Sequence, residues 1–313
     1  MRFLVMGAGA LGGYFGGRLQ GAGHDVTFVA RGAQLDAMRE SGLRIESGAG
    51  DLTLDEVRAV ADPAEAGPAD VVLFMVKNYD LREAAEALAP VMGDETVVLT
   101  VQNGVTAPER LSRILGSDHV VPGVVRLPAD VSAPGVIRHP VAFHKILIGE
   151  RSGEVTPRIW AIAEAIGGSG PECEVTQDIE GALWRKMIML SSMSAMTALT
   201  RLDIGPIRDC PQSRDLLVAC INEAAAVGRV VCPSLTARDV TEAQTFLLET
   251  IDGHVHASML DDLTRGKRLE LNVHSGEIVR LGGRHGVPTP THAFVTAALQ
   301  PFVEGAVDHQ PAG

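Results

Sequence analysis

The sequence predicts an α/β fold in which residues 1–176 form a mostly parallel sheet with crossover helices and residues 177–313 form an all-α domain. In the first part, short β-branched runs alternate with helical patterns, which is typical of a parallel sheet. After a turn-rich stretch at 167–171, the apolar spacing becomes almost wholly helical. This change of periodicity sets the expected domain boundary.

A glycine-rich motif follows the first predicted strand. The strand at Arg2–Met6 runs directly into a G-x-G-x-x-G motif formed by Gly7, Ala8, Gly9, Ala10, Leu11 and Gly12. In such a motif the first glycine permits a tight turn, the second lets the backbone approach a pyrophosphate, and the third lets helix and strand pack closely. The helix that follows, to about Ala22, would present its positive end to the phosphates. The pattern predicts a Rossmann-type dinucleotide-binding domain.

The second strand indicates which dinucleotide is bound. It is predicted at Val26–Ala30 and ends at Arg31, where an NAD-binding domain normally carries an acidic residue for the ribose 2′-OH. An arginine there fits a 2′-phosphate, so NADPH is favoured over NADH. The alternative is that Arg31 is a solvated charge at the end of a strand.

Further apolar runs complete the predicted sheet. Leu43–Ser47 and Leu52–Leu54 should form a small hairpin, and three later runs should extend the sheet with antiparallel members. The remaining expected strands are Val71–Val76, Val97–Val101, Val120–Arg126, Val136–His139, Lys145–Ile148 and Cys173–Thr176.

Two polar side chains follow strands of this sheet. Lys77 comes after Val71–Val76, and Asn103 lies in Gln102-Asn103-Gly104 after Val97–Val101. Ligands of open parallel sheets bind beyond the carboxyl ends of the strands, so both are candidate cofactor contacts. Taken alone, the lysine could equally be a solvated loop charge and the Asn-Gly pair a simple turn.

The bulk composition excludes several functions. A net charge of −12 disfavours nucleic acid and anionic membranes as partners. The four cysteines show no metal-ligand spacing, and the histidines are scattered, so no metal site is expected. No signal peptide is recognisable, and the apolar stretch Met187–Leu199 is too short to span a bilayer. These features favour a soluble, cytoplasmic protein.

The helical half offers two further candidates. Lys186 lies in Leu-Trp-Arg-Lys-Met on a strongly apolar helix, and Glu270 is expected to open a later helix. The ordinary interpretations are a lysine that reaches solvent and a first-turn carboxylate facing the helix dipole. Either residue taken singly would fit those interpretations.

The motifs together carry more information than each alone. Six motifs follow one another along the chain: the G-A-G-A-L-G start, Lys77, Gln102-Asn103-Gly104, the Leu-Trp-Arg-Lys helix, the Ser-Met-(x)10-Glu segment that begins at Ser258, and the closing segment 276–290. In that order the chain resembles the ketopantoate reductase (2-dehydropantoate 2-reductase) family over essentially its whole length. The resemblance implies NADPH-dependent reduction of ketopantoate to pantoate, in the route to pantothenate and CoA. It also implies a C-terminal domain like that of 6-phosphogluconate dehydrogenase, substrate bound between the domains, and a possible homodimer.

The resemblance assigns roles to five positions. Lys186 matches the proton donor, and Asn103 matches a residue that touches both cofactor and substrate. Ser258 matches a substrate ligand, and Glu270 matches a residue at the nicotinamide ribose and the reacting centre. Ala129 aligns less securely with a cofactor contact. These residue types suit the reaction, since a nearby ammonium can stabilise and then protonate the oxygen that gains charge when hydride arrives.

The chain departs from the family pattern in its substrate-binding helix. Positions where the family carries asparagine hold Leu190, Ser194 and Ile204. Ser194 can still form a hydrogen bond with substrate, whereas Leu190 and Ile204 cannot, and Arg201 is a candidate carboxylate clamp in their place. Polar contacts dominate discrimination between such acids, so the substrate could be a more apolar 2-oxo acid.

The sequence also leaves two other functions open. One is a related 2-hydroxy acid or opine-type dehydrogenase, which would show amine-dependent turnover or a preference for oxidation. The other is a non-catalytic sensor that binds NADPH. The presence of both Lys186 and Glu270 speaks against the sensor, because a sensor needs no proton donor.

Overall fold

The computed structural model describes residues 1–306, and the chain separates into two compact units. The first comprises Met1–Gln102 and Thr106–Ile179, and the second comprises Asn103–Val105 together with the chain from Glu180 onward. The division therefore falls three residues beyond the boundary expected after residue 176. Within residues 1–306, no helix has the length and hydropathy needed to cross a membrane.

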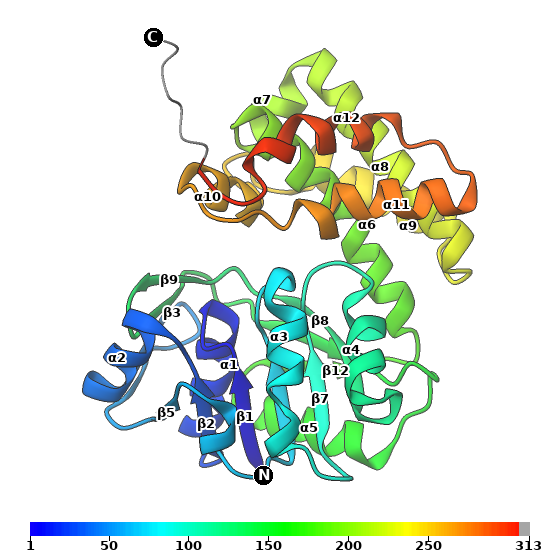
Figure 1. The fold of residues 1–313 in the computed structure, drawn as a ribbon. Helices are drawn as coiled ribbons and strands as arrows, with labels where there is room; N and C mark the ends of the chain where they lie inside the picture. The colour runs from blue at the N-terminus through cyan, green and yellow to red at the C-terminus, as the bar shows by residue number, and fades with distance from the viewer. Residues whose placement is uncertain (307–313) are drawn as a thin grey trace. The chain divides into compact units, whose positions relative to one another are not determined.

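The first unit is built on an eight-stranded sheet (Figure 1). In spatial order its strands are β12 (Glu172–Val175), β11 (Lys145–Ile148), β8 (Val120–Arg126), β7 (Val97–Thr100), β6 (Val71–Phe74), β1 (Arg2–Met6), β2 (Asp25–Val29) and β5 (Arg58–Val60). Neighbours from β5 to β8 pair in parallel. β11 pairs antiparallel with β8, and β12 runs parallel to β11, so the antiparallel members predicted from the sequence are present.

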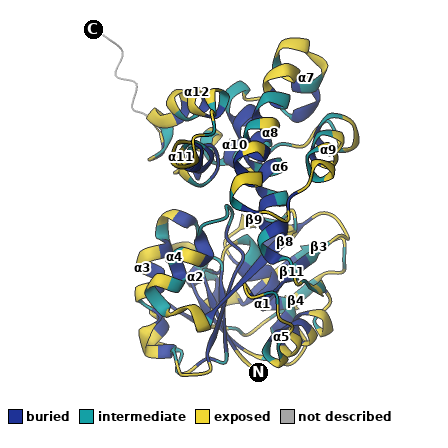
Figure 2. Ribbon diagram, turned by 90° about the vertical axis from the view of Figure 1, so that its right-hand side faces the viewer, coloured by how far each residue is buried: buried dark blue, intermediate teal, exposed yellow. Residues whose placement is uncertain are grey.

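Helices cover both faces of this sheet because successive side chains of a strand point to opposite sides. Phe3 and Val5 of β1 join one buried core with side chains of α1 and α5, and Leu4 and Met6 join a second core with α3 and α4. The helices of the first unit are α1 (Ala10–Gly21), α2 (Gly32–Ser41), α3 (Leu81–Glu86), α4 (Ala107–Leu115) and α5 (Pro157–Gly168). Figure 2 shows the strands buried and the outer faces of α3, α4 and α5 exposed.

A second, four-stranded sheet corrects one prediction. Its order is β4 (Leu52–Leu54), β3 (Leu43–Ser47), β10 (Val136–His139) and β9 (Asp130–Ala133). The β3–β4 hairpin forms as predicted, but β10 pairs with β3 instead of extending the main sheet. The reason lies in α1, where a Cβ added to Gly13 would lie 2.8 Å from Ile137 of β10. A missing side chain thus makes room for the small sheet, and apolar periodicity alone does not reveal which sheet a strand joins.

The second unit is helical in its described residues beyond Glu180, as predicted. Its helices are α6 (Ile179–Thr200), α7 (Ile204–Asp209), α8 (Pro211–Val231), α9 (Ala237–Thr245) with a π-helical turn at Phe246–Thr250, α10 (Ser258–Thr264), α11 (Ser275–His285) and α12 (Pro290–Leu299). They enclose one apolar core that includes Trp184, Met187 and Ile188 of α6. The strongly apolar pattern of α6 therefore reflects burial.

A buried polar network joins three of these helices. The Glu223 carboxylate accepts hydrogen bonds from the backbone N–H groups of Thr291 and His292, in the first turn of α12. The His292 ring contacts the Cys220 carbonyl through Nε2 at 3.0 Å and Ser275 Oγ through Nδ1 at 3.1 Å. A carbonyl only accepts, so Nε2 carries the proton and Nδ1 accepts from the Ser275 hydroxyl. The network is satisfied by a neutral imidazole, and burial lowers the pKa of His292.

We expect this histidine to make the fold sensitive to acid. The pKa of His292 is lower in the folded protein than in the unfolded chain, so its stabilising contribution is complete above the ordinary imidazole range and is lost as the pH falls through that range. Thermal unfolding followed from pH 7.5 to pH 5 should show a falling Tm. His292→Gln should flatten this dependence, whereas His254→Gln, at an exposed position, should not. An identical pH dependence in His292→Gln would contradict the assignment.

Candidate active site

The glycine-rich loop connects β1 to α1, and each of its glycines meets a different environment. Gly7 has φ +100°, and a Cβ there would lie 2.8 Å from Val76 Cγ1. A Cβ on Gly12 would lie 2.1 Å from the Gly7 carbonyl oxygen. A Cβ on Gly9 would meet no atom of residues 1–306 within 4 Å. Two glycines are therefore required by packing, while the third leaves open space in front of the backbone.

That open space lies at the start of a helix that can attract an anion. Gly9 is the N-cap residue of α1, no side chain among the described residues caps it, and the first turn of α1 holds no acidic residue. Unpaired N–H groups and the positive end of the helix dipole point outward at such a terminus. The loop thus fits a dinucleotide pyrophosphate, and a Cβ at Gly9 would occupy the approach.

Arg31 lies at the end of the neighbouring strand. Met6 of β1 pairs with Val29 of β2, so the glycine-rich loop and Arg31 leave the sheet at the same edge. Arg31 precedes α2, whose first turn also lacks an acidic residue. Its guanidinium lies 3.1 Å from the carboxylate of Glu83, and the side chains of Arg31 and Glu83 are 65% and 72% exposed. Exposed pairs of this kind contribute little free energy, so the guanidinium can exchange Glu83 for a phosphate.

Other predicted cofactor residues of the first unit lie in loops after its strands. Lys77 is half-buried and precedes the short 3-10 helix Asn78–Asp80, after β6. Ala129 lies between β8 and β9 and packs against the apolar core. Gln102, after β7, donates a hydrogen bond from Nε2 to the Val76 carbonyl at 2.9 Å. This contact ties together the loops that follow β6 and β7.

Within the second unit, the structure brings together two residues that are far apart in the sequence. Asn103 Nδ2 lies 3.5 Å from Glu270 Oε2, at the long limit of a hydrogen bond. Glu270 is 6% exposed and precedes a 3-10 helix at Leu271–Val273. The prediction that it opens a longer α-helix is therefore wrong. Gly104 has φ +87°, and a Cβ there would lie 3.0 Å from the Val273 carbonyl oxygen. The absence of a side chain at Gly104 allows this close approach and places Asn103 at Glu270.

Lys186 lies on the less buried face of α6, from which Met189 and Met193 pack partly against the apolar core of the second unit. Trp184 and Met187 are buried, whereas Lys186 is half-buried. The half-buried positions of the helix continue at Met189, Leu190 and Met193, with the spacing of three to four residues that defines one helical face. The surface that follows Lys186 along α6 is therefore apolar.

Ser194 and Ser258 lie in contrasting environments. Ser194 is 1% exposed, and its hydroxyl has no hydrogen-bond partner in the described part of the chain. Ser192, by contrast, donates to the Ile188 carbonyl four residues earlier in the same helix. Ser258 is exposed and begins α10, two residues after His256, whose Nδ1 lies 2.6 Å from Asp203 Oδ1. Ser194 thus retains unused hydrogen-bonding capacity.

The structure does not bring Arg201 to Lys186, which corrects its suggested role as a carboxylate clamp. Lys186 lies in the first half of α6 and Arg201 directly follows its last residue, so the two are about 22 Å apart along the helix axis at 1.5 Å per residue. Arg201, at φ +57°, places its guanidinium 5.7 Å from the centre of the Phe302 ring. Ile204 is fully buried at the start of α7. A small acid at Lys186 therefore cannot reach the Arg201 guanidinium.

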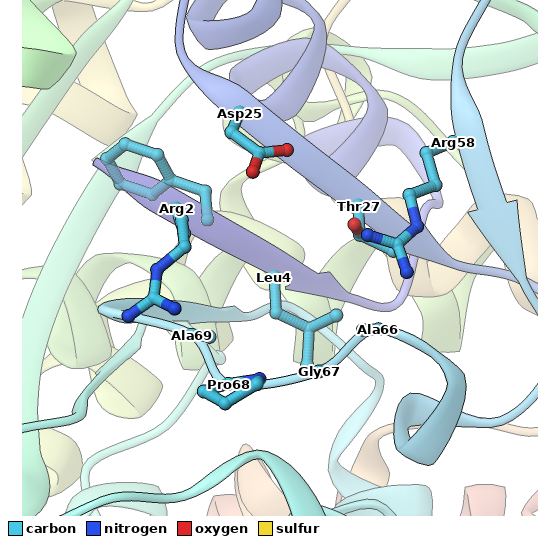
Figure 3. A pocket seen from close by; sticks show the side chains of 10 residues that line it. Arg2, Leu4, Asp25, Thr27, Arg58, Ala66, Gly67, Pro68 and Ala69 are labelled. Carbon is cyan, nitrogen blue, oxygen red and sulfur yellow. The ribbon is translucent and has the colours of Figure 1, made fainter.

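Elsewhere the described residues offer no second candidate of this kind. A small hollow lies at the opposite edge of the main sheet, at the beginnings of β1 and β2, and Figure 3 shows Arg2, Asp25, Thr27 and Arg58 around it. Arg2 there pairs with Asp70 at 2.6 Å. Among residues 1–306, no group of three or more His, Cys, Asp or Glu side chains is placed to hold a metal ion.

Sequence reasoning missed one residue that contacts the glycine-rich loop. Gln34 of α2 donates a hydrogen bond from Nε2 to the Ala8 carbonyl at 3.1 Å. A glutamine in the first turn of a helix is an ordinary surface residue in sequence terms, so no signal distinguishes it. The contact becomes visible only when α2 is placed beside the loop.

Comparison with known proteins identifies similar chains. The family description "Ketopantoate reductase PanE/ApbA" matches residues 3–153, and "Ketopantoate reductase PanE/ApbA C terminal" matches residues 178–303. A 2-dehydropantoate 2-reductase of Mesorhizobium japonicum is 33% identical, with 96% of this chain and 97% of the relative covered. The uncharacterized oxidoreductase YkpB of Bacillus subtilis is 30% identical over 96% of this chain and 99% of its own length. The crystal structure of a PanE/ApbA family ketopantoate reductase from Ralstonia eutropha superposes with a TM-score of 0.88 at 32% identity, covering 96% of this chain and 98% of that one.

Proposed function

Because this chain belongs to the ketopantoate reductase family, we propose that it reduces 2-dehydropantoate (ketopantoate) to pantoate with NADPH. Family membership makes the chain an NADP-dependent oxidoreductase that acts on a CH–OH group and takes a small 2-oxo acid as substrate. The identity of that acid is the proposed part. The observation that carries the proposal is the pairing of Asn103 with the buried Glu270, in the same unit as Lys186.

In the proposed reaction, Lys186 acts as electrophile and general acid. The chemistry supplied by NADPH, when bound, would be hydride transfer to the C2 carbonyl carbon, with the electron pair of the broken π bond passing to the carbonyl oxygen. The Lys186 ammonium stabilises this developing charge and transfers a proton from Nζ to the oxygen, which gives the 2-hydroxy acid. Glu270 orients the ammonium or the forming hydroxyl, and Asn103, at 3.5 Å from it, orients Glu270.

The proposed cofactor contacts follow the edge of the parallel sheet. Within the loop Gly7–Gly12, the N–H groups at the start of α1 would hold the pyrophosphate in the space that Gly9 leaves open, because those of Gly7 and Ala8 already donate to the Val29 carbonyl. Arg31 would hold the 2′-phosphate, exchanging its surface partner Glu83. Lys77, Asn103 and Ala129 would line the remainder of the nucleotide. This assignment is supported by the positions of these residues after the strands.

A specific observation also favours a second candidate, a more apolar 2-oxo acid. The face of α6 beyond Lys186 carries Met189, Leu190 and Met193, which offer the terminal hydroxyl of ketopantoate no hydrogen-bonding group stronger than the weakly accepting methionine sulfur. Along the same helix the Ser191 and Ser194 hydroxyls are buried without a hydrogen-bond partner in the described residues, and Ser194 is the one that replaces a family asparagine. Ser258 supplies another hydroxyl at the start of α10. The choice of substrate thus depends on whether a hydroxyl group is recognised.

One pair of substrates separates the candidates. Ketopantoate differs from 3,3-dimethyl-2-oxobutanoate only by its terminal hydroxyl, so the ratio of the two kcat/KM values measures recognition of that group. A site that bonds the hydroxyl should favour ketopantoate by about 10⁴-fold or more, whereas an apolar site discriminates by about 10²-fold or less. We expect ketopantoate to be preferred. A ratio at or below one would establish the apolar acid instead.

The same assays test the other functions. Amine-dependent turnover would indicate an opine-type dehydrogenase. Tight NADPH binding without turnover of any 2-oxo acid would indicate a sensor. Ser194→Ala adds a local test, because it removes a buried hydroxyl that lacks a partner and should leave Tm unchanged or raised. A raised KM for the preferred acid in this variant, with Ser191→Ala as the control of equal burial, would support substrate contact at Ser194.

A further inference from the structure

The Gln34 side chain connects the glycine-rich loop to a turn of the small sheet. Its Nε2 donates to the Ala8 carbonyl at 3.1 Å, and its Oε1 accepts from the backbone N–H of Gly135 at 3.0 Å. The two partners fix the orientation of the amide, since a carbonyl can only accept and an N–H can only donate. Both ends of the amide are therefore used, and exchanging its nitrogen and oxygen would break both bonds.

Hydrogen bonds hold the glycine-rich loop on two sides, and Gln34 forms the one on the side of α2. On the side of β2, the N–H groups of Gly7 and Ala8 both donate to the Val29 carbonyl, at 3.3 and 3.0 Å. On the side of α2, Gln34 holds the Ala8 carbonyl. The peptide units around Ala8 precede the open position Gly9. Because these peptide units are already fixed, the glycine-rich segment loses less conformational entropy when it binds a ligand.

The other partner of Gln34 is itself firmly placed. Gly135 lies in the β9–β10 turn at φ +76°, and its carbonyl accepts from the N–H of Arg44 at 2.8 Å. A Cβ on Gly135 would lie 3.3 Å from Cβ of Ala37, also on α2. Figure 1 shows α2, α1 and β9 in the same part of the first unit. Gln34 is thus anchored on a backbone group that the small sheet holds in place.

We propose that Gln34 is a positioning residue for the cofactor: by fixing the Ala8 carbonyl, it holds the glycine-rich loop in the conformation that receives the pyrophosphate. The inference rests on the proposed role of that loop. Arg31 lies three residues earlier, directly before α2, so one helix bears both the proposed 2′-phosphate contact and the restraint on the loop. The two residues differ in what they recognise, because the pyrophosphate is common to NADPH and NADH and the 2′-phosphate is not.

The test compares direct binding of both cofactors to the full-length protein. Gln34→Met keeps the size of the side chain but removes both hydrogen bonds, and Kd is measured from the change in nicotinamide fluorescence. We expect Kd to rise about three- to tenfold for NADPH and for NADH alike, the effect of losing one or two ordinary hydrogen bonds. The KM for NADPH should rise by the same factor with kcat unchanged. Arg31→Gln should raise the Kd for NADPH and leave the Kd for NADH unchanged.

Gln20→Met is the matched control, because Gln20 of α1 also donates to a backbone carbonyl, that of Glu56 at 2.7 Å, away from the loop. It should leave both Kd values unchanged. Unchanged Kd values in Gln34→Met would overturn the inference, and so would a lowered Tm without a change in Kd. The Gly9→Ala variant shows whether a negative result concerns only the role of Gln34 or the proposed role of the loop in binding the pyrophosphate. If Gly9→Ala weakens NADPH binding and Gln34→Met does not, only the inference fails, whereas unchanged binding in both variants would remove the assignment of the loop.

Discussion

Replacing Lys186 by alanine should lower kcat by about 10²- to 10⁴-fold, the range for loss of a general acid. The ammonium is proposed to act on the carbonyl oxygen of the substrate and not on the nucleotide, so the Kd for NADPH should stay within about twofold of wild type. Single-turnover reduction of ketopantoate, followed by the loss of nicotinamide absorbance at saturating NADPH, measures the step directly. The buried core around Trp184 and Met187 is untouched, and Tm should be preserved.

Lys267→Ala provides the control for this variant, because Lys267 is an exposed lysine of the same unit. It removes the same charge from the second unit and should leave kcat unchanged. Turnover by Lys186→Ala within threefold of wild type would refute the assigned chemistry. A large loss of NADPH affinity would instead place Lys186 at the cofactor.

The second large effect concerns the glycines of the loop, where one methyl group should have opposite consequences at two positions. Gly9→Ala adds its Cβ to open space, so stability should change by less than about 1 kcal/mol, while the Kd for NADPH should rise at least about tenfold because the methyl occupies the approach of the pyrophosphate. Gly12→Ala places its Cβ 2.1 Å from the Gly7 carbonyl oxygen. Relief requires backbone movement, so the free energy of unfolding should fall by about 3 kcal/mol.

Urea unfolding and NADPH titration of both variants check this contrast. Gly168→Ala, at the end of α5, is the control, because its Cβ would also meet no described atom within 4 Å. It should change neither quantity by much. Equal loss of stability in the two loop variants would contradict the geometry, and unchanged NADPH affinity in Gly9→Ala would contradict the role of the loop.

Much of the first unit could be predicted because its signals are local. β1, the glycine-rich loop and α1 follow one another within 21 residues, and Gly7 and Gly12 are required by the chain packed beside them. The β3–β4 hairpin was predicted for the same reason, since the turn and both strands are contiguous. β5 and β9 were missed, because β5 has only three residues and β9 has little apolar character.

The sequence by itself determined the α/β class, the nucleotide fingerprint, Arg31 at the end of β2, and the order of motifs that identifies the family. These depend on spacing within single elements, which side-chain periodicity and turn chemistry specify. Tertiary structure alone decided that β10 joins the small sheet, that Asn103 meets Glu270, and that Gln34 holds Ala8. Such contacts join residues that are distant in the chain, or on separate elements, and their geometry is fixed only when those elements pack together.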